Sequence, residues 1–357
     1  MTAHRKITEQ TSIPTAEGSG NVPDVAVPFT AAFNTDAARP LDLHVQNWAA
    51  RFGLAQAPAA AARYQAARYG SFAAWAYPEL NDLPTLAEWT TWLFVFDDQF
   101  DDGALGWDPD RARTILEELA ALLSTDSTPE PPTNGIAASL LDLWRRTAHR
   151  MPPPWRERFV SHFRAYLNGY YQEVLHRHDA QVPDLDHYIE LRRDASASDV
   201  CLDLMEFGGG YTIRPEIYAS PQYQALRTAT NDITNWTNDM VSAGKEDARG
   251  DVHNIVYILR HDSDESWTAC AARTQHMILS RCEDLLTAER ALSTLPDSLA
   301  VTTDERAILH SNIATMKLWL AGCPRWYQDN VRYHKIEYTA PGAAPAYLEE
   351  LFPPTSP

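Results

Sequence analysis

The sequence predicts a single all-α domain, a helical bundle with a central cavity. Its 357 residues are 45% hydrophobic, which is enough for one large core. Ala-rich, Leu-rich and Arg/Glu-rich segments of 10–25 residues recur along the chain, whereas the Val/Ile/Thr alternation typical of strands is scarce. Nucleotide-binding and α/β-hydrolase folds are disfavoured, because the GxGxxG, GxxxxGK and GxSxG motifs are absent.

The chain divides into a leader, one helical domain and a tail. Residues 1–25 are polar and lack periodicity, so we expect a disordered leader. The helical domain spans residues 26–340, and residues 341–357 are predicted to form a flexible tail. Breaks rich in proline or glycine separate the helices. The helix candidates are residues 40–52, 57–69, 71–77, 84–98, 109–123, 135–149, 154–177, 185–208, 214–218, 221–243, 252–259, 263–292, 304–321 and 323–334.

The composition restricts the classes of function. A net charge of −18 would repel phosphates along most of the chain, so we expect no nucleic-acid partner. The apolar run at residues 92–96 is too short to span a bilayer and no signal peptide is visible, so we expect no stable membrane insertion. Four cysteines without CxxC pairing are predicted to be reduced core thiols of a cytoplasmic protein. They are Cys201, Cys270, Cys282 and Cys323.

An acidic cluster directly follows the apolar run at residues 92–96. In a continuous helix Asp97 and Asp101 lie one turn apart on the same face, where two carboxylates repel each other unless a cation bridges them. They also stand near the C-terminal end of the helix, where the macrodipole disfavours negative charge. A solvated helix end is the alternative, but these two costs favour a site for Mg²⁺ or Ca²⁺. Asp98 and Asp102 are predicted to support this site or to pair with basic groups.

A second stripe of oxygen donors consists of Asn238, Ser242 and Glu246. Their i, i+4, i+8 spacing keeps an amide, a hydroxyl and a carboxylate within roughly 80° of one another around a helix. Together with waters they would form a second site for an oxygen-preferring cation, and Lys245 beside them would counter a diphosphate. A polar stripe facing solvent is the alternative, which the pairing of two such clusters in one helical chain disfavours.

These motifs resemble those of bacterial class I terpene synthases, most of all the sesquiterpene synthases. Residues 97–101 (Asp-Asp-Gln-Phe-Asp) resemble the family's aspartate-rich motif, and residues 238–246 match its NDxxSxxKE form at every defined position. Arg332-Tyr333 resembles the C-terminal pair that binds diphosphate when the pocket closes. Arg192 lies 46 positions before the asparagine of the second motif, where the family keeps a diphosphate-sensing arginine. The resemblance extends from about residue 28 to residue 333.

One departure from the family pattern concerns the segment after Arg192. Family members often carry an acidic linker three residues after this arginine and then a small effector residue, whereas here those positions are Ala195 and Ser196. Asp194 is displaced by one position, so either the linker contact is lost or Arg193 and Asp194 take part instead. Ion pairing on the helix surface is the alternative role for one of the two arginines.

The resemblance implies a class I terpenoid synthase-like bundle that binds three Mg²⁺ ions and a linear isoprenyl diphosphate. Its implied metal ligands are Asp97, Asp101, Asn238, Ser242 and Glu246. The implied catalytic residues are Asp97, Arg192, Arg332 and Tyr333. The implied substrate contacts are Arg192, Lys245, Arg332, Tyr333, Phe94, Ser196, Phe207 and Trp326. Core packing is the alternative for each aromatic side chain among them.

The expected reaction is the ionisation and cyclisation of the isoprenyl diphosphate to a cyclic terpene with release of diphosphate. Farnesyl diphosphate is the expected substrate, because most bacterial members of this size resemble sesquiterpene synthases, and geranylgeranyl diphosphate is the alternative. A chain-elongating prenyl transferase is disfavoured, because that class typically carries two aspartate-rich motifs. A non-catalytic helical interaction protein is the alternative from outside the enzymes, and a homodimer is left open.

Overall fold

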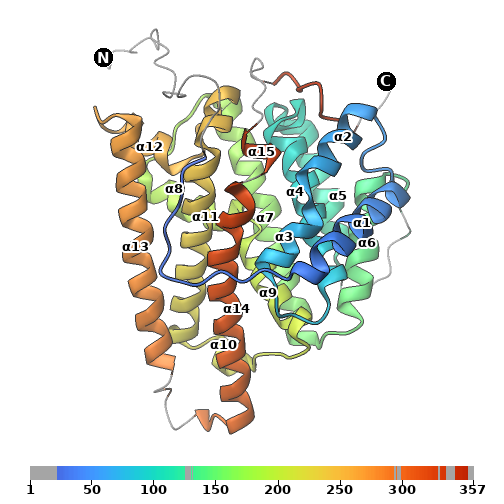
Figure 1. The fold of residues 1–357 in the computed structure, drawn as a ribbon. Coiled ribbons are helices and arrows are strands. Elements are labelled where there is room, and N and C mark those ends of the chain that lie inside the picture. Colours follow the sequence, from blue (N-terminus) through green and yellow to red (C-terminus); the bar gives the residue numbers. More distant parts are fainter. Residues whose placement is uncertain are drawn as a thin grey trace.

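The computed structural model describes residues 22–124, 130, 132–292, 295, 299–328, 330–334 and 342–352. Over these ranges the chain is helical and contains no strand, as the sequence predicts (Figure 1). The helices are α1 (Thr35–Phe52), α2 (Pro58–Ala67), α3 (Tyr69–Ala76), α4 (Leu83–Asp101), the 3₁₀-helix η1 (Ala104–Trp107), α5 (Pro109–Leu122), α6 (Gly135–Ala148), α7 (Pro153–Asp179), α8 (Leu185–Ala195), α9 (Ser198–Gly209), α10 (Pro215–Tyr218), α11 (Pro221–Arg249), α12 (Ile255–His261), α13 (Trp267–Leu292), α14 (Thr303–Gln328) and α15 (Val331–His334).

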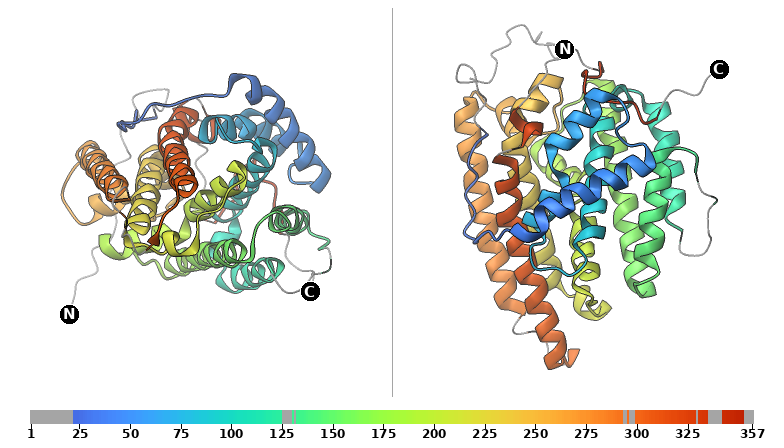
Figure 2. Two further views of the ribbon diagram at one scale, coloured as in Figure 1. Left: turned by 90° about the horizontal axis from the view of Figure 1, so that it is seen from below. Right: turned by 45° about the vertical axis from the view of Figure 1, so that its right-hand side comes forward.

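The long helices α7, α11, α13 and α14 run roughly parallel, and the view from below shows most helices end-on (Figures 1 and 2). α13 packs along α11 on the outside of the bundle, and α1 lies obliquely across α3 and α4. These outer helices cover the bundle. The interior is surrounded by the helices α3, α4, α7, α9, α11 and α14. The two acidic motifs lie on α4 and α11.

Several helix boundaries differ from the prediction. α1 begins at Thr35 rather than residue 40, and α11 continues to Arg249 rather than residue 243. Three further differences concern single residues. Arg68 has a left-handed backbone with a φ of 51° and separates α2 from α3, so the break between the predicted helices 57–69 and 71–77 lies two residues earlier than expected. The predicted helix 185–208 is broken at Ser196, whose backbone is extended. α14 continues through Pro324, because the packing of the buried side chains around it outweighs the cost of the proline. The apolar face of the helix continues past each of these three positions, so hydrophobic periodicity does not reveal them.

Aromatic packing holds α4 against α7. Trp89, Trp92 and Phe96 recur at helical spacing along α4 and are fully buried. The ring centroids of Trp89 and Phe159 are 5.3 Å apart, and those of Trp92 and Phe163 are 5.7 Å apart. Such pairs contribute roughly 1 kcal/mol each beyond the burial of their area. α7 therefore helps to fix the height and rotation of α4, whose last turn carries the aspartates.

The predictions for the two terminal segments compare differently with the structure. The predicted leader lies outside the described residues except for 22–25, where Val22 and Val25 are buried. Residues 342–352 pack on the bundle, with Phe352 only 7% exposed and Leu351 hydrogen-bonded to α4. This part of the tail is therefore attached to the domain, contrary to the prediction, because several of its polar groups find partners on the helices.

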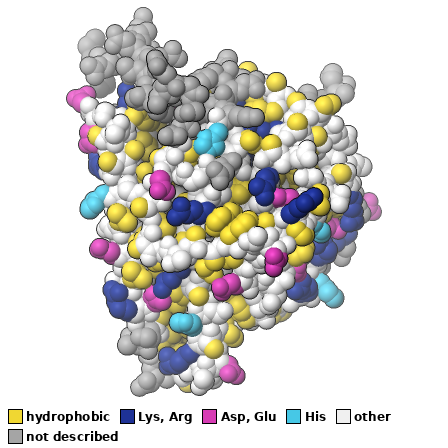
Figure 3. Space-filling model, viewed as in Figure 1, with side chains coloured by type: hydrophobic (Ala, Val, Ile, Leu, Met, Phe, Trp, Pro, Cys, Tyr) yellow, Lys and Arg dark blue, Asp and Glu magenta, His cyan; other side chains and the backbone are white. Residues whose placement is uncertain are grey.

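The surface drawn in Figure 3 carries Lys and Arg side chains interspersed with Asp and Glu. The acidic excess of the chain is therefore not gathered in one patch on this face. All four cysteines are buried and unbridged, as predicted for core thiols. Among the described residues, every helix is too short or too polar to cross a bilayer.

A buried ionic cluster ties α7 and α11 to α9. Asp203 of α9 is fully buried and accepts from Arg158 Nε at 3.1 Å, and its other oxygen lies 2.6 Å from His162 Nδ1. Arg227 Nη1 of α11 lies 3.1 Å from the same carboxylate. Burial alone would raise the pKa of Asp203, but His162, Arg227 and Arg158 together lower it to about 2. The charged form of Asp203 therefore stabilises the fold.

We expect Asp203→Asn to destabilise the protein in a pH-dependent way. Because the pKa of Asp203 is about 2 in the folded chain and 3.8 otherwise, its charge stabilises the fold fully above about pH 5, and this contribution is lost as the pH falls towards 2. The deficit of the variant should be about 2 kcal/mol at pH 7 and should shrink at pH 3. Urea unfolding at the two pH values measures it, and equal deficits would contradict the role of the charge.

Candidate active site

One cavity opens between the helices that carry the two acidic motifs. It encloses about 970 Å³ of space, including its mouth, and α3, α4, α7, α11, α14 and α15 contribute to its wall together with the α8–α9 junction. Its lining combines carboxylates, arginines and a lysine with aromatic and small side chains. A ligand with one highly charged end and one apolar end matches this lining.

The acidic cluster of α4 is divided by its helical spacing. Asp97 and Asp101 line the cavity, whereas Asp98 and Asp102 lie outside the lining. Tyr166 and Tyr170 of α7 donate hydrogen bonds to Asp97 Oδ1 at 2.7 and 2.6 Å. These tyrosines, which the sequence did not reveal, hold one carboxylate in a fixed orientation towards the cavity.

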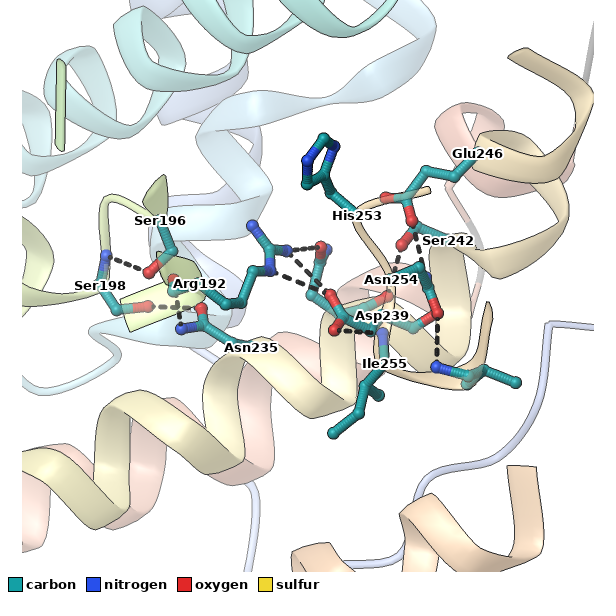
Figure 4. A network of polar contacts seen from close by, with 12 residues as sticks. Arg192, Ser196, Ser198, Asn235, Asp239, Ser242, Glu246, His253, Asn254 and Ile255 are labelled. Atoms are coloured by element: carbon teal, nitrogen blue, oxygen red, sulfur yellow. Dashed lines mark hydrogen bonds and ion pairs between the residues drawn. The ribbon is translucent and has the colours of Figure 1, made fainter. Parts of the chain in front are cut away.

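The second motif lines the same cavity from α11. Asn238 Oδ1 accepts a hydrogen bond from Arg192 Nη2 at 3.0 Å, and Glu246 Oε2 accepts one from Asn254 Nδ2 at 2.6 Å. Ser242 Oγ donates to the backbone carbonyl one turn earlier at 2.8 Å, and Figure 4 shows Ser242 beside Glu246 and Asn254. The predicted stripe of amide, hydroxyl and carboxylate thus faces the cavity of the first motif.

Arg192 reaches the cavity from the end of α8, whereas its neighbour Arg193 points elsewhere. Arg192 Nε and Nη2 lie 3.1 and 3.0 Å from Asp239 Oδ1, and the Tyr188 hydroxyl donates to the other oxygen of that carboxylate. Arg193 pairs with Asp232 at 2.7 and 2.9 Å and lies outside the cavity lining. The geometry therefore favours Arg192 over Arg193 as the arginine that serves the cavity.

The break between α8 and α9 lies in the cavity wall, which includes Ala195 and Ser196. Asn235 of α11 joins the two helix ends, since its Nδ2 donates to a carbonyl in the last turn of α8 at 3.1 Å and its Oδ1 accepts from Ser198 Oγ at 3.0 Å (Figure 4). A Cβ at Gly169 of α7 would lie 2.4 Å from the Ala195 nitrogen, so only glycine permits this close approach. The break is thus built into the packing of three helices.

Basic side chains bind the outward-facing aspartates at one edge of the cavity. Arg332 Nη1 contacts both oxygens of Asp98, at 2.6 and 2.7 Å. Lys245 Nζ lies 3.2 Å from Asp102 Oδ1. Arg332 and Lys245 also line the cavity, so each lies between an aspartate of α4 and the interior. The prediction placed Asp98 and Asp102 as partners of basic groups, and these contacts agree with it.

Further hydrogen-bond donors are available at the cavity. Tyr333 lines it, and its hydroxyl accepts from Asn238 Nδ2 at 3.3 Å, with no acceptor for its own proton among the residues that the structure describes. Arg332 Nε and Arg177 Nη1 are buried without a hydrogen-bond partner among the described residues. A buried donor without a partner is costly, so these nitrogens suit an anionic ligand.

Aromatic side chains form much of the remaining wall. The larger apolar and aromatic side chains of the lining include Phe72, Leu93, Phe94, Trp319 and Tyr327. Trp326 stacks on Phe94 with ring centroids 5.0 Å apart but does not line the cavity. Phe207 also lies outside the lining, because its face of α9 packs beneath the Arg150 guanidinium at 4.4 Å. The predictions for Phe207 and Trp326 as wall residues are therefore wrong, and Trp326 instead supports the wall from behind.

Burial disfavours the charged form of the carboxyl groups that line the cavity, and the nearby positive charges do not fully compensate for it. It raises the pKa of Asp101 to about 7 despite the charges of Lys245 and Arg177. Burial, together with the neighbouring carboxylates, raises the pKa of Glu246 to about 8. Burial also raises the pKa of Asp97. A divalent cation between the two motifs would relieve this deficit.

The donor set fits a cation that prefers oxygen. The first motif offers two carboxylates, and the second offers an amide, a hydroxyl and a carboxylate. Within the described ranges no three His, Cys, Asp or Glu side chains come close enough to chelate an ion by themselves. Other coordination positions would then fall to waters and to oxygens of an anionic substrate, as is usual for Mg²⁺.

Four buried side chains beside the motifs were missed by the sequence reasoning. Arg177 lies 2.6 Å from Asp251, 3.4 Å from Glu173 and 3.6 Å from Asp101, and His253 Nδ1 lies 2.8 Å from Asp251. The i, i+4 pair on α7 and the short segment after α11 are visible in the sequence. The contact between them spans 74 residues, and no local pattern reveals it.

Comparisons with known proteins point to one family. The family profile described as "Terpene synthase family 2, C-terminal metal binding" matches residues 88–284. Pristinol synthase from Streptomyces pristinaespiralis is 32% identical over 332 residues, covering 88% of this chain and 86% of that protein. Pentalenene synthase from Streptomyces avermitilis is 30% identical over 333 residues, covering 92% and 97%. The solved structure of a cucumene synthase variant superposes with a TM-score of 0.76 at 27% identity, covering 86% and 99%.

We expect Mg²⁺ binding to weaken as the pH falls from 8.5 to 6.5. Because the pKa values of Asp101 and Glu246 are about 7 and 8, protons compete with the cation at the lower pH. The half-saturating Mg²⁺ concentration should rise roughly tenfold or more. This concentration is measured at each pH from the rise in melting temperature as Mg²⁺ is added in the presence of inorganic diphosphate.

The control for this titration is Glu283→Gln, which alters an exposed carboxylate on α13 and should follow the wild type. A half-saturating concentration that does not change with pH would contradict the assignment of these carboxylates to the cation site.

Proposed function

The chain belongs to the terpene synthase family, and we propose that it cyclises farnesyl diphosphate in a Mg²⁺-dependent reaction that releases diphosphate. It is a class I terpene synthase, an enzyme that must stabilise a leaving diphosphate and protect a carbocation. One observation carries the proposal: two motifs of oxygen donors and a set of cationic side chains converge on a single cavity that also has an aromatic wall.

The charged end of the cavity suits the diphosphate. Asp97 and Asp101 on one side and the Asn-Ser-Glu stripe of α11 on the other would hold the metal, and we propose three Mg²⁺ ions. Bound Mg²⁺ supplies Lewis acidity to the departing diphosphate. Arg192, Lys245 and the Tyr333 hydroxyl would donate hydrogen bonds to the oxygens of this group.

Arg332 has two tasks in this proposal. Its Nη1 holds Asp98, and its Nε is buried without a partner among the described residues. A guanidinium can serve two anions at once through its fork of donors. Arg332 would therefore join the outward face of α4 to the diphosphate, and this supports its assignment as a catalytic residue.

The aromatic wall suits the hydrocarbon chain. Phe72, Phe94 and Trp319 would exclude water and hold the chain in one folded conformation. Their ring faces would stabilise positive charge by cation–π attraction. Ser196, at the broken end of α8, would contact the substrate near the reacting carbon.

The choice of fifteen carbons rests on the size of the chain and on its resemblance to bacterial sesquiterpene synthases. We also propose a cytoplasmic location, which the buried and unbridged cysteines support. The homodimer stays a prediction.

Incubation with diphosphates of ten, fifteen and twenty carbons and Mg²⁺, followed by gas chromatography, tests the proposal. We expect a cyclic fifteen-carbon product. A cyclic product from the twenty-carbon substrate alone would replace farnesyl with geranylgeranyl diphosphate. A labelled allylic diphosphate with the five-carbon homoallylic partner completes the test, because a longer diphosphate would instead identify a prenyl transferase.

We predict that Asp97→Asn lowers kcat/KM by roughly 10²-fold or more, because an amide binds Mg²⁺ less strongly than a carboxylate. The melting temperature should stay close to that of the wild type, since the tyrosine hydrogen bonds can be made to the amide oxygen. Asp142→Asn, on the outer face of α6, is the matched control. Unchanged turnover in Asp97→Asn would contradict the central assignment.

We predict that Arg332→Lys raises the share of acyclic or early-cyclised products. The lysine keeps the charge but loses the fork that serves Asp98 and the diphosphate together, so closure should be less complete and water should reach the cation earlier. Product ratios from gas chromatography measure this effect. A product profile identical to that of the wild type would remove Arg332 from the closing machinery.

A further inference from the structure

The last turn of α4 has an outward face that the motifs do not explain. Asp98, Gln99 and Asp102 lie outside the cavity lining, yet Gln99 and Asp102 are only 5% and 4% exposed. Asp98 is bound by Arg332. The other two side chains are bound by residues 345–352, which we call the C-terminal strap.

Gln99 pairs with the backbone of the strap through both ends of its amide. Its Nε2 donates to the Glu349 carbonyl at 3.0 Å, and its Oε1 accepts from the Leu351 N–H at 2.8 Å. Because Gln99 is buried, the loss of these bonds would leave polar atoms of the helix and of the strap without partners. Gln99 stands between Asp97 and Asp101 in the same turn, so the strap acts on the turn that carries both cavity carboxylates.

Tyr347 connects the strap to both metal-binding helices. Its hydroxyl donates to Asp102 Oδ2 at 2.7 Å and accepts from Arg249 Nη2 at 3.2 Å. Lys245 contacts the other oxygen of Asp102 at 3.2 Å. Asp102 belongs to the end of α4, whereas Arg249 and Lys245 belong to α11. Arg249 Nε also lies 3.4 Å from Asp102 Oδ1, so Tyr347 joins an ionic junction that links α4 to α11.

The far end of the strap is anchored to the body of the bundle. Glu349 Oε2 accepts from the N–H groups of Gln56 and Ala57, just before α2, at 2.6 and 2.8 Å. The Leu351 carbonyl accepts from Asn134 Nδ2, at the start of α6, at 2.6 Å. Because these contacts fix the strap to the segments before α2 and α6, its hydrogen bonds to α4 connect that helix to the rest of the bundle.

α2 also links the strap to the segment of Arg332. The Arg63 guanidinium lies 4.5 Å from the centre of the Tyr347 ring, and its Nη1 donates to the Val331 carbonyl at 2.6 Å. One arginine therefore contacts the strap and the residue that precedes Arg332. The outward face of α4 is thus bound by two C-terminal segments that share a support.

We propose that the C-terminal strap positions the aspartates of α4 relative to the stripe of α11, with Tyr347 and Gln99 as its two positioning residues. The inference rests on the proposed function, because it assigns the strap to the assembly of the Mg²⁺ and diphosphate site. A strap that is attached correctly keeps the two motifs at the separation that a shared diphosphate requires.

The decisive variant is Tyr347→Phe, which removes one hydroxyl and keeps the ring. We expect the Mg²⁺ concentration for half-maximal thermal stabilisation, with inorganic diphosphate present, to rise roughly fivefold or more. We also expect a larger share of acyclic product. Tyr257→Phe is the matched control, since this tyrosine of α12 lies outside the cavity lining and should follow the wild type. An unchanged half-saturating concentration with only a lower melting temperature would make the strap merely structural and overturn the proposal.

Gln99→Leu provides the second test, because it removes both amide contacts at nearly constant volume. It should shift the same half-saturating concentration, whereas Gln224→Leu, which removes an amide contact near the start of α11, should not. If Gln99→Leu fails to fold, Tyr347→Phe alone decides. A wild-type protein that turns over no isoprenyl diphosphate contradicts the proposed function. A wild type that does turn over, with Tyr347→Phe unchanged in Mg²⁺ dependence and products, contradicts the strap alone.

Discussion

The gathering of carboxylates around one buried cavity is the constraint on which the rest of the structure depends. Asp97 and Asp101 from α4, Glu173 from α7 and Glu246 from α11 all line it. Taking these groups out of water disfavours their charged forms, and burial raises the pKa of each of them. A fold that keeps them close together must supply positive charge from elsewhere.

At the end of α4 the protein places its shortest cation contacts on the outward-facing carboxylates. Arg332 and Lys245 bind the outward pair of α4, Asp98 and Asp102, at 2.6 and 3.2 Å. Asp97 instead accepts hydrogen bonds from two tyrosine hydroxyls, and among the described residues it has no such direct ion pair. The alternation of inward and outward aspartates therefore separates two tasks within one turn. The outward pair fixes the helix, whereas the inward Asp101 has a longer contact with a cationic side chain, 3.6 Å from Arg177 Nη2.

The sequence predicted the parts of this site that depend on local spacing. Periodicity predicted the helices, and i, i+4 spacing placed Asp97 with Asp101 and aligned the stripe of α11. The assignment of Phe207 to the wall was wrong, because the rotation of α9 against its neighbours is not contained in the sequence of that helix. The Arg177 cluster and the docking of residues 342–352 depend on contacts between distant segments, which a single sequence does not show. The break at Ser196 was missed because the apolar face continues across it.

The departure at Ala195 changes how the break is coupled to the charged end of the cavity. Without a carboxylate at this position, no acidic side chain there can join Arg192 to the broken helix. Asn235 instead bonds to both helix ends, and three and four residues later the same helix supplies Asn238 and Asp239, the partners of Arg192. α11 thus holds the arginine, the break and a proposed metal ligand on one rigid element. The arginine is therefore connected to the cavity wall twice, along α8 itself and through Asn235 of α11.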